Sequence, residues 1–335
     1  MRVIRLHAQH DLRAHDEPKP KPNPGEALVQ VKAVGICGSD LHWFGEASIG
    51  DAQLKRPLVL GHESAGSIAA GSHRGQRVAV DPAIPCNRCE FCLQGNPNLC
   101  ENMRFAGHGL EDGALREFVA WPEACLFPLP DSLTDEDGAM LEPLGVAIHA
   151  VDLAHLRLGM TVGVFGCGPI GLLIIQLARL AGAGTPLATD RLPHRLEAAR
   201  ALGAGQVIRA GTESEVREVA AAAGGRGVDV AFEVAGENPA VESAVAAARP
   251  GGRVILAGIP SDDRTSFPAS LARRKGLTLK LVRRMKFTYP RAIQLVESGQ
   301  VDVRSLVTHH FPLEQASEAF RTAEQREGLK VMVEC

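Results

Sequence analysis

The stretch Gly166-Cys167-Gly168-Pro169-Ile170-Gly171 decides the fold of the second half of the chain. A short apolar run (161–165) leads into it, and a helical pattern (169–181) follows. In a G-x-G-x-x-G turn between strand and helix, the first glycine permits the tight turn and the second lets backbone approach a pyrophosphate. The third lets the helix pack closely on the strand. Because the helix N-terminus also offers free N–H groups to phosphates, the stretch predicts a dinucleotide-binding turn. A plain glycine-rich turn is the alternative.

Around this turn, short apolar runs alternate with alanine-rich amphipathic segments. The strand-like runs are 186–189, 206–208, 228–234 and 253–257, and the helical patterns between them are 193–202, 213–223 and 239–248. Near-continuous apolar strands that alternate with helices are typical of a parallel sheet covered on both faces. The sequence therefore predicts an α/β, doubly wound Rossmann sheet whose last strand is 253–257.

Asp190 ends the strand after the turn, nineteen residues beyond Gly171. A carboxylate there accepts hydrogen bonds from the ribose hydroxyls of the adenosine and repels a 2′-phosphate, which favours NAD over NADP. Arg191 and Arg195 stand close by, and an arginine can accommodate that phosphate. NAD is therefore expected, and NADP stays open.

The first part of the chain has a different character. It is rich in Gly and Pro, and its β-like runs are 26–34, 64–69 and 77–80. This pattern predicts an irregular, mostly antiparallel β domain. The last part offers a helix, a strand, a second helix and a final strand at 290–298, 306–311, 313–325 and 329–333.

Length, charge and targeting signals narrow the class of protein. A chain of 335 residues favours two domains, and a net charge of −3 gives no electrostatic reason to expect nucleic acid or an anionic membrane as partner. The N-terminal stretch lacks the apolar core of a secretory signal, and the most apolar stretch (170–180) is too short and polar to span a bilayer. We therefore expect a cytoplasmic protein whose eight cysteines stay reduced.

Four of these cysteines, Cys86, Cys89, Cys92 and Cys100, follow the pattern C-x2-C-x2-C-x7-C. Four thiolates at this spacing can surround one zinc ion tetrahedrally and leave no open position, which is typical of a structural site. Two disulfides do not suit a reducing compartment, and iron–sulfur clusters use other spacings. A nucleic-acid zinc finger would need a basic helix beside the cluster, and none flanks it.

A second set of metal-binding residue types is scattered along the chain. A catalytic zinc needs three protein ligands and an open position for substrate. Cys37 and His62, with either Glu63 or Glu142, would supply these ligands.

Taken together, the motifs resemble those of the medium-chain, zinc-dependent alcohol dehydrogenases, in the same order and over essentially the whole chain. They are GICGSDLH (35–42), GHE (61–63), the four-cysteine segment (86–100), LEPLGVAIHA (141–150) and GCGPIG (166–171). The tail at 288–320 resembles the polyol branch, the sorbitol and xylitol dehydrogenases.

This resemblance implies a domain order. A GroES-like, mostly antiparallel β catalytic domain would occupy 1–145 and carry the structural zinc lobe at 86–100. A Rossmann coenzyme domain would be inserted at 146–285, and 286–335 would return to the catalytic domain.

The resemblance also implies roles for the scattered ligands. Cys37, His62 and Glu63 correspond to the catalytic zinc ligands of the family. Glu142 falls where polyol dehydrogenases have a glutamate that reaches the metal directly or through its water. The resemblance leaves open whether Glu63 or Glu142 binds the zinc itself.

Five further residues resemble the proton relay and the substrate pocket. Ser39 and His42 resemble the relay that passes the alcohol proton to solvent by way of the cofactor ribose. Arg284 resembles an arginine that hydrogen-bonds distal polyol hydroxyls, and Phe118 and Trp43 resemble pocket residues. His42 as an ordinary surface histidine is the alternative.

The chain also departs from the polyol pattern. Met285 stands where a tyrosine is usual, and Trp43-Phe44 stands where a Tyr-Trp pair is common, so the pocket has fewer hydroxyls. Ser39 could also cap a helix that begins near Asp40. The cationic run at 283–286 could be a solvated surface.

The expected function is zinc-dependent oxidation by NAD of a secondary hydroxyl of a small polyol, such as sorbitol or xylitol, to the ketose. Alternatives are an amino alcohol or simple secondary alcohol, as for threonine and butanediol dehydrogenases, or a non-catalytic dinucleotide-binding sensor. The resemblance implies a homo-oligomer, a tetramer or dimer.

Overall fold

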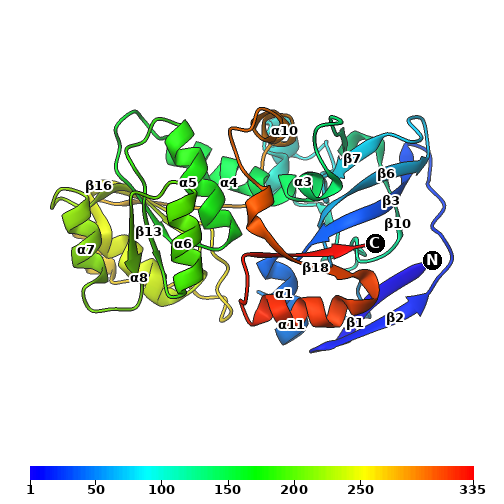
Figure 1. Ribbon diagram of the computed structural model, residues 1–335, viewed down its shortest axis with the longest axis horizontal. Coiled ribbons are helices and arrows are strands. Elements are labelled where there is room, and N and C mark those ends of the chain that lie inside the picture. The colour runs from blue at the N-terminus through cyan, green and yellow to red at the C-terminus, as the bar shows by residue number, and fades with distance from the viewer. The chain divides into compact units, whose positions relative to one another are not determined.

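The computed structural model describes residues 1–335, which divide into two compact units. The first unit comprises Met1–Gly145 together with Lys286–Cys335, and the second comprises Val146–Met285. In the first unit, segments from the two ends of the chain lie together, with α11 (Ala316–Glu324) near α1 (Gly38–Glu46) (Figure 1). The tail is therefore part of the same body as the N-terminal strands.

A seven-stranded sheet forms the frame of the first unit. Its strands run in the order β11 (Leu126–Pro128), β7 (Arg77–Val80), β6 (Glu63–Ala70), β3 (Glu26–Gly35), β19 (Lys330–Glu334) and β18 (Val307–Pro312), and β10 (Phe118–Pro122) also pairs with β3. Every pairing is antiparallel except β18 with β19. The first seven residues of β3 alternate between half-buried and buried, because one face of the strand packs on the core, and its last three residues are all buried. Its core includes Trp43, Phe44, Trp121 and Phe320.

Shorter elements complete the first unit. The small strand pairs are β1 (Arg2–Ala8) with β2 (Asp11–Asp16), β4 (Ser48–Ile49) with β5 (Ala52–Gln53), and β8 (Ala83–Ile84) with β9 (Arg104–Phe105). The other helices are α2 (Glu90–Leu93), α3 (Asp135–Ala139) and α10 (Tyr289–Glu297), with 3-10 turns at Pro97–Leu99, Glu123–Cys125, Arg304–Leu306 and Leu313–Gln315. Helix α4 (Leu141–Ala154) contains the boundary between the units.

The second unit is a six-stranded, wholly parallel sheet with helices between its strands. The strand order is β14 (Gln206–Arg209), β13 (Leu187–Asp190), β12 (Val162–Phe165), β15 (Val228–Glu233), β16 (Ala248–Leu256) and β17 (Thr278–Leu281). The helices are α5 (Pro169–Leu180), α6 (Pro193–Ala201), α7 (Glu215–Ala222), α8 (Asn238–Ala247) and α9 (Ala269–Lys275). Because the order reverses at β12, the loops after β12 and β15 diverge at the edge where such sheets bind ligands.

The predicted fold class is confirmed, but two details of the expectation are wrong, and the sequence did not predict α4 or α9. The strand at 253–257 does not close the sheet, since β17 follows it as the edge strand. The apolar segment at 141–150, which the sequence analysis did not assign, lies in α4. Ser39 does not cap α1, because Cys37 occupies the N-cap position and Ser39 is the second helical residue.

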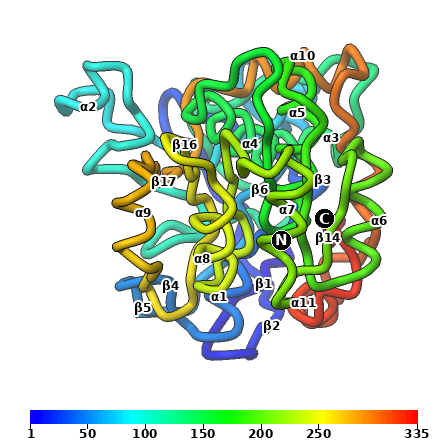
Figure 2. Tube along the Cα trace, turned by 90° about the vertical axis from the view of Figure 1, so that its left-hand side faces the viewer, coloured from blue at the N-terminus to red at the C-terminus, as the bar shows by residue number.

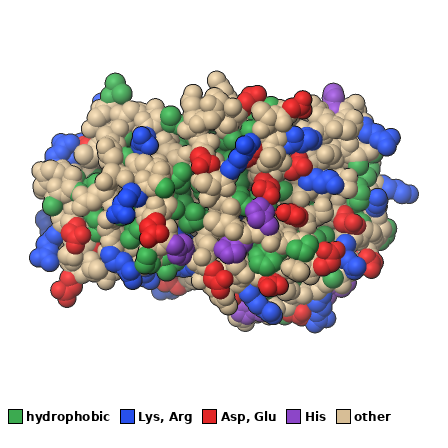
Figure 3. Space-filling view, viewed as in Figure 1, with side chains coloured by type: hydrophobic (Ala, Val, Ile, Leu, Met, Phe, Trp, Pro, Cys, Tyr) green, Lys and Arg blue, Asp and Glu red, His purple; other side chains and the backbone are tan.

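No helix has both the length and the hydrophobicity needed to cross a bilayer. On the face shown in Figure 3, lysine and arginine side chains are interspersed with aspartate and glutamate.

Candidate active site and metal centres

Cys37, His62 and Glu63 come together because two chain segments meet at the end of the β3–β6 pair. Gly35, the last residue of β3, lies opposite Glu63, the first residue of β6. A side chain at position 35 would overlap the Glu63 carboxylate, so the close approach requires glycine there. The ligand atoms of Cys37, His62 and Glu63 all lie within 4.8 Å of one another. A thiolate, an imidazole and a carboxylate at this spacing form a donor set that fits zinc.

Asp40, which sequence reasoning did not single out, fixes this cluster from behind. Its buried carboxylate accepts hydrogen bonds from the backbone N–H of Cys37 (3.0 Å) and of Gly61 (3.1 Å). One of its oxygens also lies 3.3 Å from Nδ1 of His62. A carboxylate behind a ligating histidine sets its tautomer and ring orientation, leaving Nε2 to face a metal. The C-x-x-D spacing, a variant of the helix capping box, is the signal that could have revealed it.

The electrostatics of this pair follow from its burial. Burial by itself would raise the pKa of Asp40, but the charge of His62 and the hydrogen bonds leave that pKa below its ordinary value. Burial would lower the pKa of His62, but Asp40 and Cys37 together raise it well above its ordinary value. In the metal-free chain the imidazolium thus balances the surrounding anions.

Lys330 is the second residue that sequence reasoning missed. Its ammonium donates to both carboxylate oxygens of Glu63, at 2.8 and 2.7 Å, and to the carbonyl of Ile36 at 3.0 Å. Lys330 and Glu63 are both buried. Burial by itself would lower the pKa of Lys330, but the negative charges of Glu63 and other neighbours outweigh it, so the pKa is raised above its ordinary value. Each carboxylate oxygen keeps a second lone pair, so this ion pair is compatible with Glu63 as a metal ligand.

Glu142 lies in the first turn of α4 and is buried, but it is outside the three-residue group. Burial raises its pKa to about 7, although the charge of His62 opposes the shift and that of Glu63 adds to it. This pKa is that of the metal-free chain, and a zinc ion at the neighbouring cluster would lower it because a nearby cation favours the carboxylate.

The expected relay residues lie on one helix. Ser39 and His42 are three residues apart on α1, a spacing that places both on the same face. His42 is only partly exposed, and its Nδ1 lies 3.2 Å from a carboxylate oxygen of Glu46.

The expected substrate residues have more varied surroundings. Trp43 is 2 % exposed within the core of the first unit and meets His108 edge to face. The ammonium of Lys19 lies over the Phe118 ring, 3.8 Å from the ring centroid, in a cation–π contact. Arg284 belongs to the second unit, where it is half-buried and has a positive φ of 55°.

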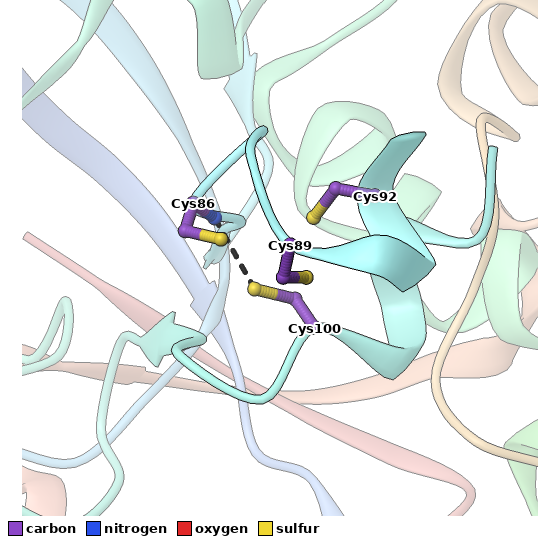
Figure 4. Close-up of side chains that lie close together, drawn as sticks. All are labelled: Cys86, Cys89, Cys92 and Cys100. Carbon is purple, nitrogen blue, oxygen red and sulfur yellow. Dashed lines mark hydrogen bonds between the residues drawn. The ribbon is translucent and has the colours of Figure 1, made fainter. Parts of the chain in front are cut away.

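The four-cysteine segment folds into a lobe set apart from β3 and β6 of the same unit (Figure 2). The sulfurs of Cys86, Cys89, Cys92 and Cys100 converge, and all lie within 4.8 Å of one another (Figure 4). The backbone N–H of Cys86 donates to the sulfur of Cys100 at 3.2 Å. All eight cysteines are free of disulfides, so the cluster keeps four thiols available to a metal.

Hydrogen bonds from the backbone N–H of Arg88 and Cys89 lower the pKa of the Cys86 thiol to about 6. Burial, in contrast, raises the pKa of the Cys92 thiol to about 12. A bound zinc ion would hold all four as thiolates.

The glycine-rich turn has the geometry that phosphate binding requires. Gly166 has φ of 111°, and a Cβ there would lie 2.9 Å from the backbone nitrogen of Ala235. Gly168 is the N-cap of α5, and Pro169 is its first residue. The buried carboxylate of Glu233 accepts hydrogen bonds from the N–H of Ala235 (2.8 Å) and Gly236 (2.7 Å), so it fixes the loop on which Gly166 packs.

Asp190 and its neighbouring arginines lie where the cofactor ribose is expected. Asp190 is buried and accepts hydrogen bonds from the N–H of Cys167 at 2.7 Å and of Leu192 at 2.8 Å. Nη1 of Arg191 lies 2.8 Å from a carboxylate oxygen of Glu237. Arg195 points elsewhere, with its Nη1 3.7 Å from the place of a Cβ on Gly168.

A third group of metal-binding residue types was not predicted. It consists of Glu136, His310 and Glu334 on the surface of the first unit. Nδ1 of His310 lies 3.1 Å from Glu136 and 3.4 Å from Glu334. Hydrogen bonding between the imidazole of His310 and the two carboxylates is compatible with these distances.

Comparison with known proteins agrees with this geometry. A family model described as zinc-binding dehydrogenase matches residues 169–298, and one described as alcohol dehydrogenase GroES-like domain matches residues 23–131. The sorbitol dehydrogenase of Bacillus subtilis (strain 168) is 39 % identical over 99 % of this chain and 97 % of its own length. "Probable D-xylulose reductase A" of Emericella nidulans is 38 % identical over 98 % of this chain and 94 % of its own length.

A solved structure has the same fold. A zinc-binding dehydrogenase from Sinorhizobium meliloti 1021, bound to NADP, superposes with a TM-score of 0.91 at 31 % identity, covering 100 % of this chain and 99 % of that one. The chain belongs to the zinc-dependent alcohol dehydrogenase family. It is an oxidoreductase that uses zinc and a nicotinamide dinucleotide, and its cysteine, histidine and carboxylate clusters and its glycine-rich turn fit these cofactors.

Proposed function

We propose that this dehydrogenase oxidises a secondary hydroxyl of a small polyol, such as sorbitol or xylitol, to the ketose with NAD. The observation that carries the proposal is the buried Glu142 beside the cluster of Cys37, His62 and Glu63, in a chain 39 % identical to a sorbitol dehydrogenase over 99 % of its length.

Zinc would be held by Cys37 and His62, with Glu63 or Glu142 as the third ligand, and as a Lewis acid it would lower the pKa of the substrate hydroxyl. Asp40 keeps the His62 ring in place, and Lys330 balances the charge of Glu63. The Ser39 hydroxyl would accept the proton of the substrate while it gives its own proton to the ribose of the bound cofactor. From the ribose, His42, which is partly exposed on the same face of α1, would pass a proton towards solvent.

NAD is the expected cofactor because the fixed, buried carboxylate of Asp190 favours ribose hydroxyls over a 2′-phosphate. The Sinorhizobium meliloti dehydrogenase holds NADP on the same fold, so the fold alone does not choose the cofactor. The preference of this chain must come from its own residues around Asp190.

A simple secondary alcohol or an amino alcohol is the second candidate. It is favoured by the apolar residues Trp43, Phe44 and Met285, which stand where polyol enzymes usually carry tyrosine or tryptophan and so offer fewer hydrogen bonds to extra hydroxyls. A non-catalytic sensor would not need the full ligand set that the chain retains.

The deciding experiment is initial-rate oxidation of a panel of stereochemically varied polyols, with 2,3-butanediol and threonine alongside, using NAD and NADP in parallel. Higher kcat/KM on a polyol with NAD is the expected result. Activity only on butanediol or threonine would establish the second candidate, and a Cys37→Ala variant that retains turnover would contradict the zinc assignment.

The proposal includes a cytoplasmic location and assembly into a homo-oligomer. The eight free thiols suit a reducing compartment. Light scattering on the purified protein, with a mass of two or four chains as the expected result, tests the assembly.

A further inference from the structure

The ion pair between Arg191 and Glu237 crosses the expected dinucleotide site. Arg191 follows β13 and Glu237 stands in the loop after β15, on either side of β12 in the sheet. The glycine-rich turn follows β12, so the ion pair lies across the carboxyl ends of the strands, where a dinucleotide binds in such sheets. Nε of Arg191 also lies 3.8 Å from the place of a Cβ on Gly211, in the loop after β14.

Of the two arginines that follow Asp190, Arg191 is the one placed to reach a 2′-phosphate. Arg195 lies beside Gly168, where the pyrophosphate is expected. The guanidinium of Arg191 lies among the loops at the adenosine end, but Glu237 already binds it at 2.8 Å.

We propose that Glu237 is a second determinant of cofactor choice, because it holds Arg191 and keeps it from binding the 2′-phosphate of NADP. The inference rests on the proposed NAD preference. It assigns that preference to the carboxylates of both Asp190 and Glu237, instead of to Asp190 alone. Asp190, Arg191 and Glu237 together carry a net charge of −1, so an incoming phosphate dianion meets an excess of negative charge. The ribose 2′-hydroxyl of NAD carries no charge and is little affected.

Removal of the Glu237 charge should turn Arg191 into a phosphate ligand. A guanidinium binds phosphate through two parallel hydrogen bonds, which are stronger than neutral ones. The pair itself is exposed, with 52 % of the Arg191 and 31 % of the Glu237 side chain accessible, so it adds little to stability. Glu237 makes no side-chain cap on α8, so Glu237→Gln should leave the helix intact.

The test measures binding of 2′,5′-ADP and of AMP, which differ only in the 2′-phosphate, to the full chain by isothermal titration calorimetry. Glu237→Gln should raise the affinity for 2′,5′-ADP about tenfold while AMP binding changes less than about threefold. Adding Arg191→Gln to this variant should remove the gain.

Glu242→Gln is the matched control, since Glu242 is an exposed acid on the same helix. An unchanged 2′,5′-ADP to AMP ratio in Glu237→Gln, an equal gain in Glu242→Gln, or a gain that survives Arg191→Gln would each overturn the proposal. Because binding needs no turnover, failure to oxidise polyols leaves this result unaffected. A wild-type chain that binds both nucleotides equally would contradict the NAD preference alone.

Discussion

The buried charges around Cys37 compensate one another residue by residue. Asp40 faces His62, and Glu63 faces Lys330, so each anion next to the cluster has its own cation. A buried charge that loses its partner is strongly destabilising, because the desolvation cost remains when the attraction is gone. Single substitutions here should therefore have effects that depend on which partner is left behind.

Asp40→Asn should weaken zinc retention at the Cys37 cluster by about 10- to 100-fold, because the amide no longer holds His62 with a negative charge. Competition with a chromogenic chelator measures this loss. Asp16→Asn, at a carboxylate 78 % exposed, is the control and should retain zinc as the wild type does. Equal retention in both variants would show that Asp40 does not support the ligand.

Lys330→Met should destabilise the first unit of the metal-free chain by about 3 kcal/mol, because Glu63 stays buried as an unpaired anion. Both tryptophans, Trp43 and Trp121, lie in that unit, so urea unfolding followed by tryptophan fluorescence reports on it selectively. The double variant Glu63→Gln/Lys330→Met should regain most of the loss. A double variant as unstable as Lys330→Met would assign the effect to packing instead of charge.

At the scale of the element, the sequence predicted strands β12 to β16 and helices α5 to α8 of the second unit, because apolar runs of strand length alternate there with amphipathic segments of helix length. It did not predict α9 or β17, nor α4 between the units. The apolar segment at 141–150 has no polar stripe to mark a helix face, and in the structure it forms most of α4. Strand β17 has the sequence TLKL, in which Thr278 and Lys280 interrupt the leucines, so it lacks an uninterrupted apolar run. Ser39 was a plausible cap by residue type, but the N-cap position falls two residues earlier, at Cys37.

Asp229 ties three strands of the second unit together. Its buried carboxylate accepts hydrogen bonds from the N–H and Oγ1 of Thr161, both at 2.8 Å, just before β12. Arg249 of β16 and Arg226 also donate to it. Although burial raises its pKa, the hydrogen bonds from Arg249 and Thr161 lower that pKa from 3.8 to about 2.

Because this folded pKa lies below the unfolded value, the unfolded chain binds the proton more tightly. Asp229 should therefore contribute about 2 kcal/mol above pH 4, and this contribution should be lost as the pH falls from 4 to 2. Urea midpoints by circular dichroism at pH 6, 4, 3 and 2.5 measure it. The difference between wild type and Asp229→Asn should shrink steadily over that range, and a difference that stays constant with pH would rule out the ionic explanation.

At the scale of the whole molecule, the sequence could indicate which residues bind a metal, but not all the residues from distant parts of the chain that contact them. Cys37, His62 and Glu63 were proposed together, and their ligand atoms are close in the structure. Lys330 lies 267 positions from Glu63, and no local pattern fixes a contact over that distance. The remaining signal was the lysine that precedes the apolar residues Val331–Val333 in β19, because a buried cation requires an anion.

The full chain should contain about two zinc ions, one in the four-cysteine lobe and one at the Cys37 cluster. Elemental analysis of the purified protein measures the ratio. Cys37→Ala and Cys89→Ser should each reduce it to about one, and only the first should abolish turnover while NAD binding persists. A wild-type ratio near one would show that one of the two clusters does not hold metal.

The pairing of β19 with β3 also joins two strands that the ribosome makes at different times. The ribosome delivers Cys37, His62 and Glu63 early, then makes all of residues 146–285, and only afterwards adds Lys330 and its strand. Until then the emerging chain lacks β19, which joins β3 to the edge strand β18, and the ammonium that balances Glu63. A nascent chain can thus complete its nucleotide-binding half on the ribosome. The catalytic half can complete its sheet only after β19 has been made and pairs with β3.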